Sequence, residues 1–336
     1  MTEEQQNVLI SIIQNDKLTT EQQIYKLSLE LEKLNTYKLI SNPKSILESI
    51  DLEEISLKSG KNSANRINLN NDIFENYLGS VNKKELIVVA GRPAMGKTQF
   101  LVNLANLISD NHSVLYFSLD ANITDLTLRF LANESGISKN LNHLNDNSSL
   151  LFNVKENFKN KKIHLVDSPD YSLFQIKEYL KSQIVQLNIE VVFIDYLQLI
   201  TDKNYRIREQ EISSIMKSLK ALAKELNVCI IVASQLSRSV ETRGGEKKPI
   251  LSDLRESGSI EEFSDKVLFL YRPEYYQLTV DENGDSTINQ VQIIVAKNNN
   301  ANTQIINFER DPEFTRFRVK SNSNDNLTWD FKVDGL

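Results

Sequence analysis

Short apolar runs alternate with helical segments along the chain from about residue 85 onward. The runs are rich in Val, Ile and Leu, and they lack the strict apolar–polar alternation of a strand with one wet face. This pattern predicts an α/β fold in which a mostly parallel sheet is covered by helices on both faces. The predicted strands are ELIVVA (85–90), SVLYFSLD (113–120), KIHLVDS (162–168), VVFIDYLQLI (191–200) and VCIIVASQLS (228–237).

The clearest helical spacing lies at about residues 209–226 and predicts an amphipathic helix. One face of this helix carries Ile212, Ile215, Leu219, Leu222 and Leu226. The opposite face carries lysines that we interpret as solvent-exposed, namely Lys217, Lys220 and Lys224.

The pattern changes near both ends of the chain. From about residue 266 the runs KVLFLYR and VQIIVAK, with the Asn-Gly turn of DENGDS between them, indicate antiparallel strands. Residues 3–14, 21–34 and 44–57 have helical spacing, and residues 58–70 are polar and read as a linker. We therefore predict a helical N-terminal region with a linker helix over residues 1–62, and one α/β domain over residues 63–336.

The composition is that of a globular protein and argues against disulfides, a membrane span and a zinc site. The 336 residues are 40% hydrophobic and 25% charged, which is ordinary for a globular protein. The single cysteine, Cys229, lies in an apolar run, so disulfides within the chain are excluded and a reducing cytoplasm is expected. We expect no membrane span because every apolar run is short, and no zinc because the three histidines lack ligand spacing. The net charge of −6 gives no support to nucleic-acid binding, but a ring can line a channel with a few cations.

The segment GRPAMGKT, Gly91 to Thr98, joins the first predicted strand to a helix. Strand, G-x-x-x-x-G-K-[ST] and helix together form a P-loop, whose backbone N–H groups bind phosphate oxygens. Lys97 is predicted to contact the β- and γ-phosphates of a nucleoside triphosphate, and Thr98 to ligate Mg²⁺. The predicted nucleotide-binding residues are Gly91, Arg92, Pro93, Ala94, Met95, Gly96, Lys97, Thr98 and Gln99.

Three more polar residues end predicted strands. Asp195 fits the acid that holds Mg²⁺, and Gln235 fits an amide that senses the γ-phosphate. Asp120 is placed to orient or deprotonate the attacking water. The competing interpretation of each is a polar residue that only caps the end of a strand.

Taken in order, these segments resemble the C-terminal motor domain of DnaB-type replicative DNA helicases. The resemblance covers roughly residues 68–320, and its most specific part is SDLRESGSIE, because P-loops occur in many unrelated proteins. It implies a RecA-like fold, ATP with Mg²⁺ between the subunits of a homo-hexameric ring, and movement along single-stranded DNA. A helicase loader or another replication protein is an implied partner. A recombinase-like or RadA-like ATPase is disfavoured by SDLRESGSIE and by the absence of a cysteine-based zinc module.

The resemblance also assigns roles to residues. Lys97, Thr98, Asp195 and Gln235 match the family's phosphate, magnesium and sensor positions. In the LRESG segment, Arg255, Glu256 and Gly258 match the loop that grips the DNA backbone; the alternative is that Arg255 and Glu256 only pair with each other.

Three departures from the family pattern change what the resemblance implies, and the first two bear on catalysis. The family usually has glutamate where Asp120 stands, and Asn299 occupies the position of its trans-acting arginine finger. Lys297 remains as a cation in that segment and is our candidate for a catalytic point charge. Only about 62 residues stand in place of the large N-terminal domain. Two hypotheses remain open: an ATP-driven DNA helicase or translocase, and a ring that hydrolyses ATP slowly and serves as a DNA-binding scaffold or regulator.

Overall fold

The computed structural model describes residues 10–13, 19, 23, 26–27, 65–67, 69, 79–136, 148–167, 172–254, 258–311 and 315–319. The chain divides into two units, Met1–Asn62 and Ser63–Leu336, and the second is described here. The helices predicted within residues 3–57 lie almost wholly outside the described residues, so the N-terminal assignment stays a prediction. Within the described part, none of the helices combines the length and the apolar character that crossing a membrane requires.

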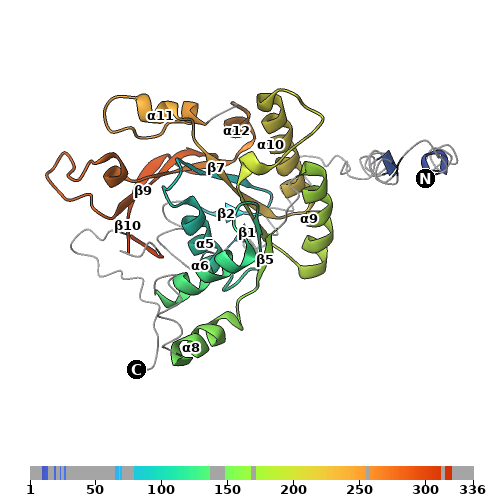
Figure 1. Ribbon diagram of the computed structural model, residues 1–336, viewed down its shortest axis with the longest axis horizontal. Helices are drawn as coiled ribbons and strands as arrows, with labels where there is room; N and C mark the ends of the chain where they lie inside the picture. Colours follow the sequence, from blue (N-terminus) through green and yellow to red (C-terminus); the bar gives the residue numbers. More distant parts are fainter. Residues whose placement is uncertain are drawn as a thin grey trace, which may run out of the picture. The chain divides into compact units, whose positions relative to one another are not determined.

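A nine-stranded sheet forms the centre of the second unit, in the order β11-β10-β9-β8-β3-β7-β6-β4-β5 (Figure 1). Six neighbouring strands, from β8 to β5, are parallel, and β9, β10 and β11 extend one edge in antiparallel fashion. The strands are β3 (Leu86–Gly91), β4 (Val114–Ser118), β5 (Ile163–Asp167), β6 (Val191–Asp195), β7 (Cys229–Gln235), β8 (Lys266–Tyr271), β9 (Gln290–Asn298), β10 (Gln304–Arg310) and β11 (Phe317–Val319). A separate two-stranded sheet pairs β1 (Arg66–Ile67) with β2 (Val81–Asn82).

The helices cover both faces of the large sheet, which confirms the predicted fold class (Figure 1). They are α5 (Lys97–Ile108), α6 (Ile123–Ser135), α8 (Ser148–Phe158), α9 (Leu173–Leu187), α10 (Arg208–Glu225), α11 (Ser239–Thr242) and α12 (Gly258–Phe263), with 3₁₀ turns at Leu197–Leu199, Leu251–Asp253 and Pro273–Tyr276. In β3, Ile87 and Val89 pack with α5 and α6, whereas Val88 faces α9 and α10. Both faces of the strand are buried, and this explains its continuous apolar run.

Two sequence predictions need correction. The run at Lys266–Tyr271 was predicted to be an antiparallel strand, but only one edge of β8 is antiparallel. That edge pairs with β9, and the other edge pairs in parallel with β3. Of the three α10 lysines predicted to be exposed, Lys217 and Lys224 are exposed, but Lys220 is half-buried. Lys220 Nζ bonds the Asp265 carboxylate and the Lys84 carbonyl oxygen, since the segment leading into β8 passes beside the helix.

A buried ion pair ties the start of β3 to the start of β8. Lys266, 1% exposed, lies 3.1 Å from the Glu85 carboxylate, which also accepts hydrogen bonds from Asn82 and Asn300. Removing one partner leaves the other as an uncompensated buried charge. We therefore expect Glu85→Ala to lower the free energy of unfolding in urea by about 3–5 kcal/mol. The double variant Glu85→Leu/Lys266→Met should recover much of that loss; a single variant as stable as the wild type would contradict this account.

Candidate nucleotide-binding site

The loop between β3 and α5 has the backbone shape of an anion cradle. Ala94 and Gly96 have positive φ angles of 62° and 95°. Gly91 approaches β8 so closely that an added Cβ would lie 3.2 Å from the Leu270 carbonyl oxygen. Gly96 caps α5 without a side-chain hydrogen bond, so the N–H groups of the first turn are left for an anion.

Lys97, the first residue of α5, places its ammonium group inside this loop. Its Nζ donates to the carbonyl oxygens of Gly91 at 3.0 Å and Arg92 at 3.1 Å. Burial lowers the pKa of Lys97 to about 8, with the Asp195 carboxylate acting in the opposite direction. The ammonium therefore loses its proton at mildly alkaline pH.

Asp195, at the end of β6, is a buried carboxylate beside the loop. It is 5% exposed, and the Tyr116 hydroxyl donates to its Oδ2 at 3.0 Å. Burial raises the pKa of Asp195, whereas hydrogen bonds from Thr98 and Tyr116 favour its charged form. A carboxylate next to a threonine hydroxyl supplies the oxygen ligands that Mg²⁺ prefers.

Gln235 ends β7 directly beside the end of β3, opposite Gly91 in the ladder. Its backbone N–H donates to Gln198 Oε1 at 3.0 Å, and Gln198 Nε2 donates to Ser234 Oγ at 2.9 Å. The Gln198 side chain thus fixes the end of β7. Sequence reasoning missed Gln198, because a glutamine after a strand carries no distinctive signal.

Lys97, Asp195 and Gln235 line one cavity of about 470 Å³. The parallel strands carry their carboxyl ends to the same edge of the sheet, and this brings together segments more than a hundred residues apart. The lining residues are Pro93, Ala94, Gly96, Lys97, Thr98, Gln99, Asp120, Arg129, Asp195, Tyr196 and Gln235.

Arg129 is the main residue that sequence reasoning missed. It comes from α6 and lines the cavity, and its buried Nε is without a hydrogen-bond partner among the described residues. Such an orphaned cationic donor suits a polyanion. In the sequence Arg129 stands between Leu128 and Phe130 of a helical stretch, where nothing connects it to the P-loop.

Three of the predicted nucleotide-binding residues have side chains whose contacts lie outside the cavity. Arg92 bonds Glu241 and the Leu236 carbonyl oxygen, and Met95 is buried in the core. Gln99 borders the cavity, but its Nε2 donates to the Thr315 carbonyl oxygen at 2.7 Å. At these positions only the backbone is available to phosphate.

Two further predicted site residues, Lys297 and Gly258, are not among the residues that line this cavity. Lys297 is at the opposite end of the sheet, next to the start of β8, and its Nζ donates to the carbonyl oxygens of Glu261 at 2.7 Å and Ser264 at 2.8 Å. Gly258 is the exposed first residue of α12. Arg255 and Glu256 lie outside the described residues.

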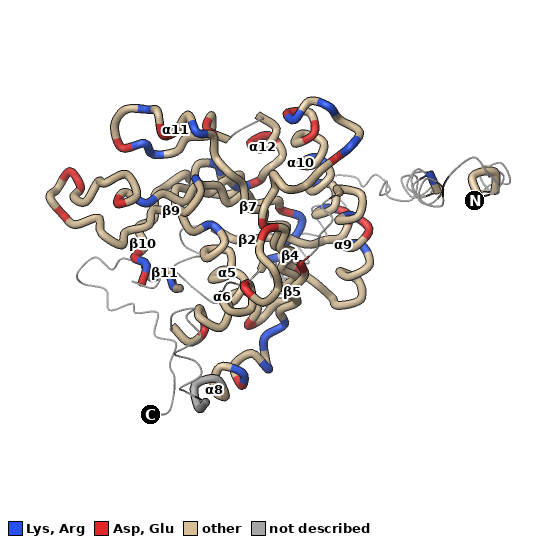
Figure 2. Tube along the Cα trace, viewed as in Figure 1, with Lys and Arg blue, Asp and Glu red and all other residues tan. Residues whose placement is uncertain are grey.

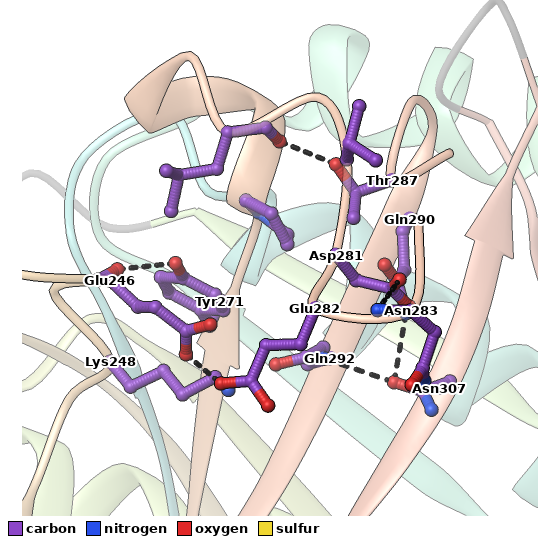
Figure 3. Close-up of a pocket in the computed structure, with 13 residues that line it drawn as sticks. Glu246, Lys248, Tyr271, Asp281, Glu282, Asn283, Thr287, Gln290, Gln292 and Asn307 are labelled. Carbon is purple, nitrogen blue, oxygen red and sulfur yellow. Dashed lines mark hydrogen bonds and ion pairs between the residues drawn. The ribbon is translucent and has the colours of Figure 1, made fainter. Parts of the chain in front are cut away.

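A second cavity, of about 260 Å³, lies beside the end of β8 (Figure 3). Three carboxylates, those of Glu246, Asp281 and Glu282, share its lining with Lys248. Also in its lining, the side-chain amide oxygen of Asn307 accepts hydrogen bonds from two glutamines of β9, Gln290 and Gln292. This acidic lining opposes the binding of a triphosphate, so the P-loop cavity is the candidate nucleotide site.

The pKa of Lys97 gives a pH dependence for nucleotide binding. Below pH 8 the free protein already carries the ammonium charge that phosphate requires, and above it a proton must be taken up on binding. The dissociation constant of ATP is therefore expected to rise by up to about tenfold per pH unit above pH 8. Titrations in buffers between pH 7 and 9.5 measure this rise, and Lys97→Arg should flatten it. A constant affinity across that range would show that Lys97 keeps its proton.

The fold and this cavity together define a P-loop nucleotide-binding protein of the RecA-like class. The profile described as "DnaB-like helicase C terminal domain" matches residues 67–319. The chain therefore belongs to the DnaB-like helicase C-terminal domain family.

Its relatives support the assignment. The chain is 35% identical to a "Probable replicative DNA helicase" of Trieres chinensis, over 89% of this chain and 66% of that protein. It is 37% identical to "Replicative DNA helicase DnaB" of Geobacillus stearothermophilus, over 70% of this chain and 52% of that protein. The chain thus spans about half to two thirds of the length of these relatives.

Solved structures give the same result. One of them, titled as an ATPase domain, superposes with a TM-score of 0.74 and 27% identity, covering 83% of this chain and 100% of that one. A structure titled "The Structure Of A DnaB-Like Replicative Helicase And Its Interactions With Primase" also reaches 0.74 with 27% identity, covering 94% of this chain and 76% of that one.

Proposed function

We propose that this chain is the motor of an ATP-dependent DNA helicase that acts in replication. The observation that carries the proposal is the cavity in which Lys97, Asp195 and Gln235 meet at the carboxyl edge of the sheet. Family membership supports ATP as the nucleotide and single-stranded DNA as the polymer. A cytoplasmic location follows from the same proposal.

Each side chain in the cavity has a task that its position allows. The N–H groups of the loop and Lys97 bind the β- and γ-phosphates. Thr98 and Asp195 would hold Mg²⁺, which would neutralise charge on the phosphate oxygens. Asp120 accepts a proton from the attacking water, and Gln235 contacts the γ-phosphate. Arg129 adds a guanidinium from α6, and its unpaired Nε is the donor that remains for a phosphate oxygen.

A ring of identical chains completes this proposal. Lys297 and Asn299 lie at the end of β9 near Lys266, far from the P-loop that follows Gly91 in the same chain. Any contact of Lys297 with a γ-phosphate must therefore be made in the site of a neighbouring copy. Such a contact also requires Lys297 to leave its two carbonyl partners.

We assign the binding of single-stranded DNA to the segment around Arg255, Glu256 and Gly258. The exposed N-terminus of α12 and a neighbouring arginine bind phosphate without reading sequence. Lys, Arg, Asp and Glu are interspersed around α11 and before α10, so the described surface there has no single sign of charge (Figure 2). A loader or primase as a partner belongs to this proposal as well.

A second candidate function is favoured by Asn299 and Asp120. Both departures weaken the same step, stabilisation of charge in the hydrolysis transition state. A ring that binds ATP and DNA but turns over slowly would act as a scaffold or regulator.

The test is ATP turnover with and without single-stranded DNA. A helicase motor is expected to be stimulated by DNA and to lose turnover in Lys97→Ala. Turnover in the wild type no faster than in Lys97→Ala, together with retained ATP and DNA binding, would select the scaffold. The absence of both ATP and DNA binding would overturn both functions.

A further inference from the structure

Arg92, the second residue of the P-loop, directs its guanidinium away from the nucleotide cavity. Its Nε and Nη2 lie 2.9 and 2.8 Å from Glu241 Oε1, and its Nη1 donates to the Leu236 carbonyl oxygen at 2.9 Å. The residue is only 8% exposed. Three directed bonds from one buried guanidinium form a rigid link, because the planar fork fixes both partners at once.

Both partners of Arg92 belong to the segment that follows β7. Leu236 comes directly after the strand, and Glu241 lies in α11 (Ser239–Thr242). The segment then closes on itself, since Arg243 pairs with Asp253 and the Ser237 N–H donates to the Asp253 carbonyl oxygen at 2.9 Å. An isolated bridge joins Leu236 to Leu254. Residues 236–254 therefore form one closed loop, which we call the α11 loop.

The α11 loop connects the two sites of the proposed function. Its first residue follows Gln235 of the nucleotide cavity, and Leu254 immediately precedes Arg255 of the segment assigned to DNA. Arg92 also contacts the cavity from its other end, because its carbonyl oxygen accepts a hydrogen bond from Lys97 Nζ at 3.1 Å. One residue thus touches the phosphate-binding ammonium through its backbone and the α11 loop through its side chain.

We propose that the Arg92–Glu241 ion pair is a positioning contact through which nucleotide binding sets the affinity for single-stranded DNA. This inference rests on the proposed function. Phosphate oxygens compete with the Arg92 carbonyl for the Lys97 ammonium, and a shift of the Arg92 backbone moves the α11 loop with it. Contacts alone show only that the two sites are connected in space. The proposal is that the Arg92–Glu241 pair transmits the change in DNA affinity that nucleotide binding causes.

The experiment measures the affinity of the full chain for a fluorescent oligothymidylate, with and without a non-hydrolysable ATP analogue. In the wild type the analogue is expected to change the affinity about 5–150-fold, the usual range for coupled sites. Arg92→Gln and Glu241→Gln should each reduce this change to less than about threefold. The double variant should resemble either single variant, because both remove the same contact. A charge swap, Arg92→Glu with Glu241→Arg, should restore part of the coupling.

Two further readouts separate this role from a purely structural one. Glu241→Gln should retain the wild-type affinity for ATP, and its unfolding midpoint should stay close to that of the wild type. Nucleotide-dependent DNA binding that persists in Arg92→Gln would overturn the inference and leave the helicase proposal intact. A tenfold loss of ATP affinity in Glu241→Gln would also overturn it. A wild type that binds neither ATP nor DNA would overturn the proposed function along with the inference.

Discussion

Replacement of Asn299 by arginine is expected to raise the rate of ATP turnover by roughly 10²–10³-fold. An arginine finger supplied in trans is worth roughly 10³–10⁵ in rate in GTPases, and a neutral amide cannot supply that charge. We expect less than the full factor because the Asn299 backbone N–H is already bonded to the Asp265 carbonyl oxygen at 3.0 Å, which restricts the segment. The measurement is steady-state phosphate release with saturating ATP and single-stranded DNA.

A mixing experiment shows whether the new arginine acts across the interface. The variant Lys97→Ala/Asn299→Arg should have negligible turnover by itself, because its own cradle lacks the ammonium. Added to wild-type chains, it should raise their turnover, since it donates an arginine to a neighbour with an intact Lys97. Lys97→Ala alone is the matched control and should lower the rate of the mixture. If Asn299→Arg has no effect either by itself or in the mixture, the segment after β9 does not reach a neighbouring site.

Asp195→Asn is expected to reduce ATP turnover by roughly 10²–10³-fold, the scale for the loss of one pre-organised electrostatic contact. Asparagine has nearly the same shape and keeps an oxygen for the Tyr116 hydroxyl, which donates to Oδ2 at 3.0 Å in the wild type. The charge that we propose holds Mg²⁺ is lost. Turnover measured against the concentration of Mg²⁺ should therefore show a weaker dependence on the metal as well as a lower maximum.

Loss of folding would not explain such a result. Burial raises the pKa of Asp195, so keeping this carboxylate charged costs the folded protein stability at neutral pH. The neutral asparagine should unfold at the same or a higher denaturant concentration. Tyr116→Phe serves as a control that removes a hydrogen bond from the carboxylate and keeps its charge. Near wild-type turnover in Asp195→Asn would remove this residue from the metal site.

The sequence predicted the parts of the fold that depend on local pattern. The P-loop strand, the two-face burial of the parallel strands and the helix at Arg208–Glu225 follow from apolar spacing and glycine positions. Pairing partners follow from tertiary contacts, and for this reason the parallel edge of β8 was missed. The predicted strand at 191–200 ends at Asp195, since a 3₁₀ turn begins two residues later at Leu197.

The same distinction between local pattern and tertiary contacts applies to the residues of the candidate site. Residues at the carboxyl ends of strands were predictable, because parallel strands bring those ends to one edge. Arg129 and Gln198 were not, since Arg129 depends on how α6 packs beside the cavity and Gln198 on how the turn after β6 packs against β7. The direction of the Arg92 side chain was equally hidden, because its partner Glu241 is 149 residues away in the sequence.

Binding of MgATP to the purified chain, measured by calorimetric titration alongside Lys97→Ala, tests the central claim most directly. We expect saturable, magnesium-dependent binding of about one nucleotide per chain in the wild type, and its loss in the variant. Equal affinity in both proteins, or heat changes in neither, would contradict the claim that the loop after β3 holds a triphosphate.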